Sequence, residues 1–181
     1  MTAGALVVSG AGGPDRVFAL LDRDDQGCAG GADIPRAESL QRARDATLCL
    51  LNQQRVAHGL PPLRVSVRLE RASQKHSEDM GVRNFYAHDD PDGRGFAARV
   101  EAEGVSRTGT ALAENIHWAV DVAARPTAIV EDWMDSAGHR ANILNAGLTH
   151  VGIGIGLDPP EPVRKFAAVY TTDFSGEMPA K

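Results

Sequence analysis

The chain has 181 residues, of which 43% are hydrophobic and 24% are charged, a composition typical of a soluble globular protein rather than of a disordered one. The formal net charge is -5 at pH 7 and the basic residues are scattered, so we expect no nucleic-acid partner. No apolar run approaches the ~20 residues that a membrane helix needs, and we expect no transmembrane segment.

Residues 1–32 are interpreted as an N-terminal appendage, tied down at Cys28 if that cysteine is bridged. Glycine and alanine are frequent in this segment, and nothing in it is long enough to form a domain. Its first thirteen residues are mildly apolar but have no basic segment, so a secretory signal is not evident in this chain.

From residue 40 onward, apolar residues recur at helical spacing. Leu40, Ala43 and Leu50 indicate a first helix that ends by Gly59, ahead of two prolines. Ser66 is suited to cap the beginning of a second helix. Further short helices are expected over 96–103, 126–136 and 138–145.

The strand signals lie late in the chain. Residues 111–120 have a mixed apolar character that is typical of a strand. Residues 151–157 alternate apolar side chains with glycine, which places the side-chain bulk on one face. Residues 166–174 form a return strand, so the last two strands are expected to pair antiparallel. Helices followed by strands predict an α+β protein with a small antiparallel sheet covered by helices.

Six histidines could carry chemistry, and four of them have ordinary or undecided interpretations. His58 suits the C-terminal end of the first helix, where a cation is favourable. His76 shares an apolar helix face and is expected to be a hydrogen-bonded core residue. The orientation of His117 is undecided, and His150 is expected to be exposed.

His88 and His139 are the stronger candidates. His88 follows an aromatic segment and leads into a turn, and loops at the ends of elements are where functional side chains concentrate. His139 follows Gly138, a small residue that permits close approach. The chain contains no HExxH, no GxSxG and no phosphate-binding glycine loop, and no serine or cysteine is placed beside a base.

The two cysteines, Cys28 and Cys49, leave two interpretations open on spacing alone. They are either buried free thiols or one bridge. A bridge closing a loop of about 20 residues would stabilise the fold by roughly 3 kcal/mol and would imply an oxidising compartment.

Several segments, taken in order, resemble the bacterial branch of the CAP superfamily, which comprises cysteine-rich secretory, antigen 5 and plant pathogenesis-related proteins. The resemblance covers about residues 40–175, and five motifs in one order make it specific. The five motifs are 72–80, 85–88 with 91–93, 113–116, 133–144, and 151–154 with Tyr170, Asp173 and Phe174. In addition, residues 52–55 and 59–63 resemble the first helix of the family and the loop after it.

The resemblance implies that residues 33–181 form a CAP (SCP) domain, a three-layer α-β-α sandwich with a central antiparallel sheet. It also implies a surface cleft lined by histidines and acidic residues. By motif, these are His88, His139 and Glu114, which are the candidate catalytic and metal-binding residues. Asn115, Ser136 and Arg140 fall in the same motifs and are given supporting roles.

The chain departs from the family pattern in two places. Eukaryotic members carry a second glutamate where this chain has Ser136, with Asp135 beside it. Ala113 also stands where many members have glycine. Both departures weaken the case for hydrolysis and leave open whether Asp135 or Ser136 replaces the missing acid.

The cysteines also resemble those of extracytoplasmic actinobacterial members, which carry one cysteine in the first helix and another shortly upstream. This resemblance implies a Cys28–Cys49 disulfide and an extracellular or cell-envelope location. Free cysteines would instead indicate the cytoplasm.

We therefore expect a binding module whose cleft takes a divalent metal, a small molecule, a lipid or a protein. Two imidazoles suit Zn²⁺ or a similar cation, and the carboxylate could be a third ligand or could orient a histidine. The alternative is a metal-assisted hydrolase of peptide or cell-wall material. A third interpretation is that these residues form a polar network that only holds the helices on the sheet. We expect a monomer and no organic cofactor.

Overall fold

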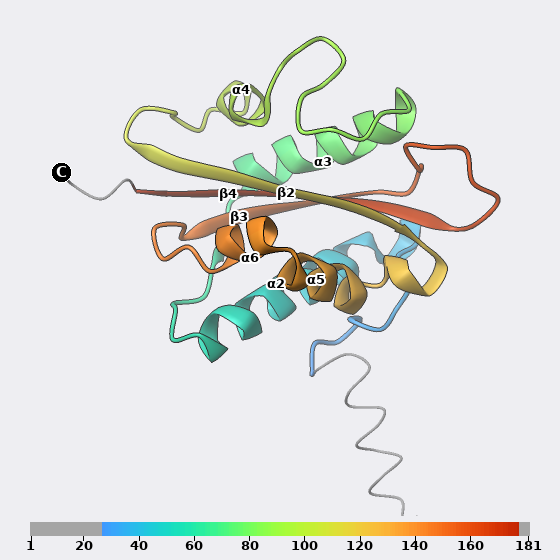
Figure 1. The fold of residues 1–181 in the computed structure, drawn as a ribbon, viewed down its shortest axis with the longest axis horizontal. Helices are drawn as coiled ribbons and strands as arrows, with labels where there is room; N and C mark the ends of the chain where they lie inside the picture. The colour runs from blue at the N-terminus through green and yellow to red at the C-terminus, as the bar shows by residue number, and fades with distance from the viewer. Residues whose placement is uncertain (1–26, 178–181) are drawn as a thin grey trace, which may run out of the picture.

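The structure, a computed structural model, describes residues 27–177. A central sheet lies between two helical layers, with α3 and α4 on one face and α2, α5 and α6 on the other (Figure 1). This arrangement confirms the predicted α-β-α sandwich. The elements are η1 (Ala37–Ser39), α2 (Leu40–Ala57), β1 (Arg64–Val65), α3 (Val67–Val82), α4 (Phe96–Ala102), β2 (Thr110–Val120), η2 (Asp121–Ala124), α5 (Pro126–Asp135), α6 (Ala137–Ile143), β3 (His150–Gly156) and β4 (Ala167–Glu177).

The sheet has the strand order β1-β3-β4-β2, so β2 lies at an edge. β4 pairs antiparallel with both β3 and β2, as expected for the long strands. The two-residue strand β1 adds to β3 in parallel, which makes the complete sheet mixed. The sequence gives no strand signal there because two exposed residues are too few to show an alternating pattern.

The glycines of β3 allow α3 to lie directly against the sheet. A Cβ atom at Gly152 would collide with the backbone at Leu69, and one at Gly154 with the backbone at Ser73. The apolar residues that alternate with these glycines point to the opposite face and are buried there, as the sequence pattern predicted. The Ser73 hydroxyl lies 3.1 Å from the Gly152 carbonyl, a contact that is possible only at this close approach.

Three helix ends have the features that the sequence predicts for them, whereas α6 ends at Ile143, two residues before its expected end. Ser66 precedes α3, and its Oγ accepts a hydrogen bond from the Leu69 amide at 3.5 Å. Pro126 stands in the first turn of α5, where its missing N–H costs nothing. His58 follows α2, and its Nδ1 lies 2.7 Å from the Gln54 carbonyl.

The larger core lies between the sheet and α2, α5 and α6. Trp133 and Tyr170 meet there edge to face, with ring centroids 6.5 Å apart. Arg55 is buried beside this core, and no carboxylate of residues 27–177 pairs with it. Its guanidinium instead donates hydrogen bonds to four backbone carbonyls, those of Pro61, Ile143, Asn145 and Leu148.

A disulfide joins Cys28 to Cys49 in α2, with the Cα atoms 5.7 Å apart, which confirms the bridge that the family resemblance implied. The carbonyl of Gly31 also accepts hydrogen bonds from the Thr127 amide and hydroxyl, at 3.1 and 3.0 Å. Residues 27–32 are thus held against α2 and α5. Residues 1–26 of the predicted appendage, including its mildly apolar first thirteen residues, lie outside the described residues.

Within residues 27–177, no helix is both long and apolar enough to cross a membrane.

Candidate cleft at the edge strand

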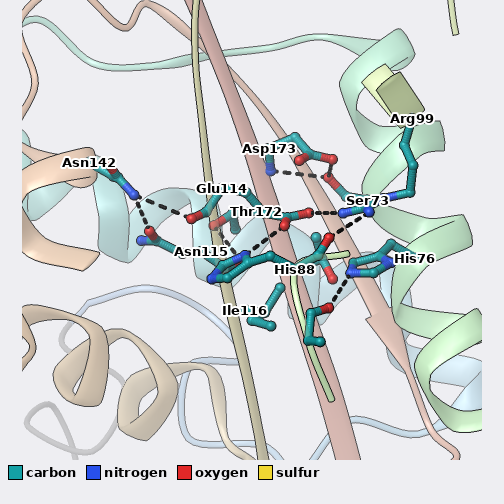
Figure 2. A network of polar contacts seen from close by, with 12 residues as sticks. Ser73, His76, His88, Arg99, Glu114, Asn115, Ile116, Asn142, Thr172 and Asp173 are labelled. Atoms are coloured by element: carbon teal, nitrogen blue, oxygen red, sulfur yellow. Dashed lines mark hydrogen bonds and ion pairs between the residues drawn. The ribbon is translucent and has the colours of Figure 1, made fainter. Parts of the chain in front are cut away.

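The three residues that the sequence singled out come from three different elements around β2. His88 lies in the loop between α3 and α4, Glu114 lies on β2, and His139 lies near the beginning of α6. Because β2 is the edge strand, side chains from both helical layers can reach it. Figure 2 shows His88 and Glu114 within a polar network that extends to Arg99 on α4.

His88 and Glu114 form a direct pair. Nδ1 of His88 lies 2.8 Å from Oε1 of Glu114, whose side chain is 1% exposed. The His88 side chain is 52% exposed. With Nδ1–H donating to the carboxylate, the lone pair of a neutral His88 ring is on Nε2, which has no hydrogen bond to a described residue.

Arg99 holds both members of this pair. Its Nη2 donates to Oε2 of Glu114 at 2.6 Å, and its Nη1 donates to the backbone carbonyl of His88, also at 2.6 Å. Both carboxylate oxygens of Glu114 are therefore engaged. In this arrangement Glu114 orients His88, and each of its oxygens already accepts a hydrogen bond.

His139 is positioned through backbone contacts on the other side of β2. Asn115 Nδ2 donates to the His139 carbonyl at 3.2 Å, and Asn142 Nδ2 lies 2.8 Å from Asn115 Oδ1 and 3.3 Å from the Glu114 carbonyl. These amides fasten α6 to the edge strand. No hydrogen bond to a described residue holds the His139 ring itself.

The two imidazoles differ in basicity. The hydrogen bond with Glu114 raises the pKa of His88, and its burial opposes this only partly. Burial lowers the pKa of His139, and the neighbouring His117 and His88 lower it further. His139 is therefore neutral at neutral pH, the form in which an imidazole binds a metal.

The position of the family's second glutamate contains no substitute carboxylate in contact with the pair. Asp135 is exposed and Ser136 is partly buried, and neither side chain hydrogen-bonds to another described residue. Arg140 donates to the Met134 carbonyl at 2.6 Å, away from Glu114. Gly138 has open space around it, so its small size is not required for packing.

Arg99 carried no signal in the sequence, where it is one arginine among many. Ser73 and Asp173 belong to the family motifs, but their contact joins distant elements and no short segment predicts it. His117, whose orientation the sequence leaves undecided, has its Nε2 3.0 Å from Asp132 Oδ2.

His76 is a core residue, as expected. It is 1% exposed, its Nε2 donates to the Ala87 carbonyl at 3.0 Å, and burial lowers its pKa. It lines a hollow of about 350 Å³ beside α3. The charged side chains there pair with one another, as Arg83 with Asp92 at 2.7 Å and Arg94 with Asp90 at 2.9 Å.

A second hollow, of about 460 Å³, lies beside His88. It is lined by His88, Asp89, Phe96, Leu112, Ala113, Glu114 and Asn142. Among residues 27–177, no three His, Cys, Asp or Glu side chains are already arranged around a common point for a metal ion. His88 lines this hollow, and His139 lies close enough for the charge of His88 to lower its pKa. Imidazole nitrogens are donors that borderline cations prefer.

The three layers, the His88 oriented by Glu114 and the second histidine on α6 are the arrangement expected of a CAP-domain protein. The family model of the cysteine-rich secretory protein family, CAP, matches residues 48–171, and the chain belongs to this family.

Individual relatives agree with this assignment. The chain is 33% identical over 105 residues to the uncharacterized protein YkwD of Bacillus subtilis, a match covering 58% of this chain and 39% of YkwD. It is similar to an extracellular SCP-domain protein from Bacillus anthracis, with 29% identity, a TM-score of 0.56, and coverage of 76% of this chain and 40% of that one. A cysteine-rich secretory protein from Staphylococcus aureus shares the fold, with 17% identity, a TM-score of 0.58, and coverage of 78% and 40%. The chain thus spans about two fifths of the length of these proteins.

Proposed function

We propose that this protein is an extracellular or cell-envelope binding module whose cleft takes a divalent cation through His88 and His139. The observation that carries the proposal is the pairing of His88 Nδ1 with Glu114 at 2.8 Å, because it directs the Nε2 lone pair away from the carboxylate. Metal-binding histidines commonly donate their other ring N–H to a carboxylate in this way.

The donor atoms of the cleft support a cation of Zn²⁺ type rather than Ca²⁺ or Mg²⁺. Calcium and magnesium require several oxygen ligands, whereas Glu114 has both oxygens engaged by His88 and Arg99. Imidazole nitrogens suit zinc and related metals. A cation bound by two protein ligands leaves positions for water or for an anionic group of a binding partner.

Binding is favoured over side-chain nucleophilic hydrolysis because, among the described residues, no serine or cysteine is paired with a base in the cleft. Both cysteines are in the disulfide, and Ser136, three positions before His139, makes no hydrogen bond to it. The glutamate that could act as a second acid or base in other members is replaced by this serine. A metal-assisted hydrolase therefore remains the alternative to test only after cation binding is established.

An oxidising location is supported by the Cys28–Cys49 disulfide, since cytosolic reductants keep most such pairs reduced. The relative from Bacillus anthracis is described as extracellular. Both observations agree with secretion or with attachment to the cell envelope.

The test is calorimetric titration of Zn²⁺ into metal-stripped protein at neutral pH. We expect one-to-one binding that is lost in His88→Ala and in His139→Ala. His58→Ala is the matched control, because His58 is exposed at the end of α2 and should leave binding unchanged. Absence of binding in folded protein would reject the cation site, and lipids, glycans and proteins would then be tested as ligands.

A further inference from the structure

Asp173 lies directly opposite Glu114 in the sheet. The two residues are Cα partners in the antiparallel pairing of β2 with β4, so their side chains share the face that α3 covers. Glu114 is 5% exposed and Asp173 is 1% exposed. Like charges placed opposite each other across two strands destabilise a sheet, and burial makes this repulsion stronger.

Among residues 27–177, only one of these two carboxyls forms an ion pair. Arg99 pairs with Glu114 at 2.6 Å, and no Lys, Arg or His nitrogen of residues 27–177 lies within ion-pair distance of Asp173. Asp173 Oδ2 contacts Ser73 on α3, and Gly152 of β3 is the Cα partner of Asp173. Its Oδ1 is buried and has no hydrogen-bond partner among the described residues. A buried carboxylate surrounded in this way would lack a counter-charge.

The hydrogen bonds around Ser73 also require an additional proton. Ser73 Oγ accepts the Asp173 amide N–H at 3.1 Å, and it lies 2.8 Å from Asp173 Oδ2 and 3.1 Å from the Gly152 carbonyl. The serine hydroxyl has one proton, which cannot satisfy two acceptors at once. A proton on Oδ2 resolves the shortage, since Asp173 then donates to Ser73 and Ser73 donates to Gly152.

We propose that Asp173 is a positioning residue of the cleft that stays protonated at neutral pH, leaving Glu114 as the single buried carboxylate to which Arg99 and His88 bind. Burial and the adjacent Glu114 both raise the pKa of Asp173, and the hydrogen bond from Ser73 and the charge of Arg99 oppose them only in part. An ionised Asp173 would compete for Arg99 and would weaken the contact that orients His88.

This inference rests on the role proposed for the His88–Glu114 pair, but it can be tested on metal-free protein. The first experiment is the carboxyl ¹³C chemical shift of Asp173 between pH 5 and pH 8, assigned by its disappearance in Asp173→Asn. We expect the shift of a protonated acid at pH 7. The shift of a carboxylate at pH 7 would overturn the proposal.

A second variant tests whether the charge of Glu114 keeps Asp173 protonated. Glu114→Gln removes the neighbouring negative charge and frees Arg99, so the titration midpoint of Asp173 should move to lower pH. A midpoint that does not move would overturn the claim that the two carboxyls are coupled.

The effect on His88 can be read from the ¹⁵N titration of its ring. Asp173→Asn exchanges a neutral acid for a neutral amide, so the pKa of His88 should be unchanged. Asp89→Asn is the matched control, because the charge of Asp89 raises the pKa of His88 and its removal should lower it. A fall in Asp173→Asn as large as that in Asp89→Asn would show an ionised Asp173.

These outcomes are separate from those of the zinc titration. A protonated Asp173 in a protein that binds no zinc would leave the positioning role intact and reject only the cation. Zinc binding in a protein whose Asp173 is ionised would support the cation site and reject the role proposed for Asp173.

Discussion

Arg55 of α2 donates hydrogen bonds to the carbonyls of Ile143 and Leu148, at 2.8 and 2.9 Å, and so joins the first helix to both ends of the segment between α6 and β3. The guanidinium is fully buried, and desolvation lowers its pKa. The same α6 carries His139. Arg55 therefore links helix α2 to helix α6, which carries His139 of the cleft.

Replacing Arg55 with methionine should destabilise the fold by about 3 kcal/mol or more, because it leaves several buried carbonyls without donors. The measurement is urea unfolding at neutral pH. Arg42→Met is the matched control: Arg42 forms an exposed pair with Asp33 at 3.3 Å and should cost under about 1 kcal/mol. Equal losses in the two variants would contradict the role assigned to Arg55.

The close contact of β3 with α3 predicts that Gly154→Ala is strongly destabilising. The new Cβ would collide with the backbone of Ser73 and Gln74, so the helix would have to move, at a cost of about 2 kcal/mol or more. Gly138→Ala should be neutral or stabilising, since nothing lies within 4 Å of the added atom and alanine favours helix α6. Thermal unfolding of both variants checks this contrast, which similar melting temperatures would refute.

Removing the disulfide with the double substitution Cys28→Ser and Cys49→Ser should cost roughly 3 kcal/mol, as expected for a closed loop of 21 residues in the chain-entropy model. The native protein, isolated without reductant, should give no free thiol on titration. Two reactive thiols in that sample would contradict both the bridge and the oxidising location inferred from it.

Glu114→Gln should lower the pKa of His88, because the carboxylate that accepts the Nδ1 hydrogen bond is the main cause of its elevation. A raised folded-state pKa of a histidine stabilises the fold at pH values below the unfolded pKa, and this contribution is lost as the pH rises through the folded pKa. The stability difference between wild type and Glu114→Gln should therefore be larger at pH 5.5 than at pH 9. Zinc affinity should fall about 10- to 100-fold. A difference that is constant with pH would contradict the proposed pairing.

The parts of the fold that depend on local pattern could be predicted from the sequence. The glycine alternation of β3, the Ser66 cap and Pro126 in the first turn of α5 each follow from a few adjacent residues. β1 was missed because two residues make no periodicity, and its pairing depends on where β3 happens to lie.

The cleft was predicted in part, through motifs shared with a known family. Those motifs include His88 and Glu114, and the structure brings the two side chains together. They do not mark Arg99, nor the hydrogen bond between Ser73 and Asp173, which are 100 residues apart in the chain. Such contacts depend on the register of the sheet and on the depth at which α3 packs, which no short segment specifies.

The central claim is that His88 and His139 bind one cation, and ¹⁵N spectra of the histidine rings before and after one equivalent of Zn²⁺ test it most directly. We predict large shifts at Nε2 of His88 and at one ring nitrogen of His139, with the Nδ1–H of His88 still bonded to Glu114. The resonances of His58 and His76 should not move. Zinc that shifts other rings and leaves His88 and His139 unchanged would contradict the account.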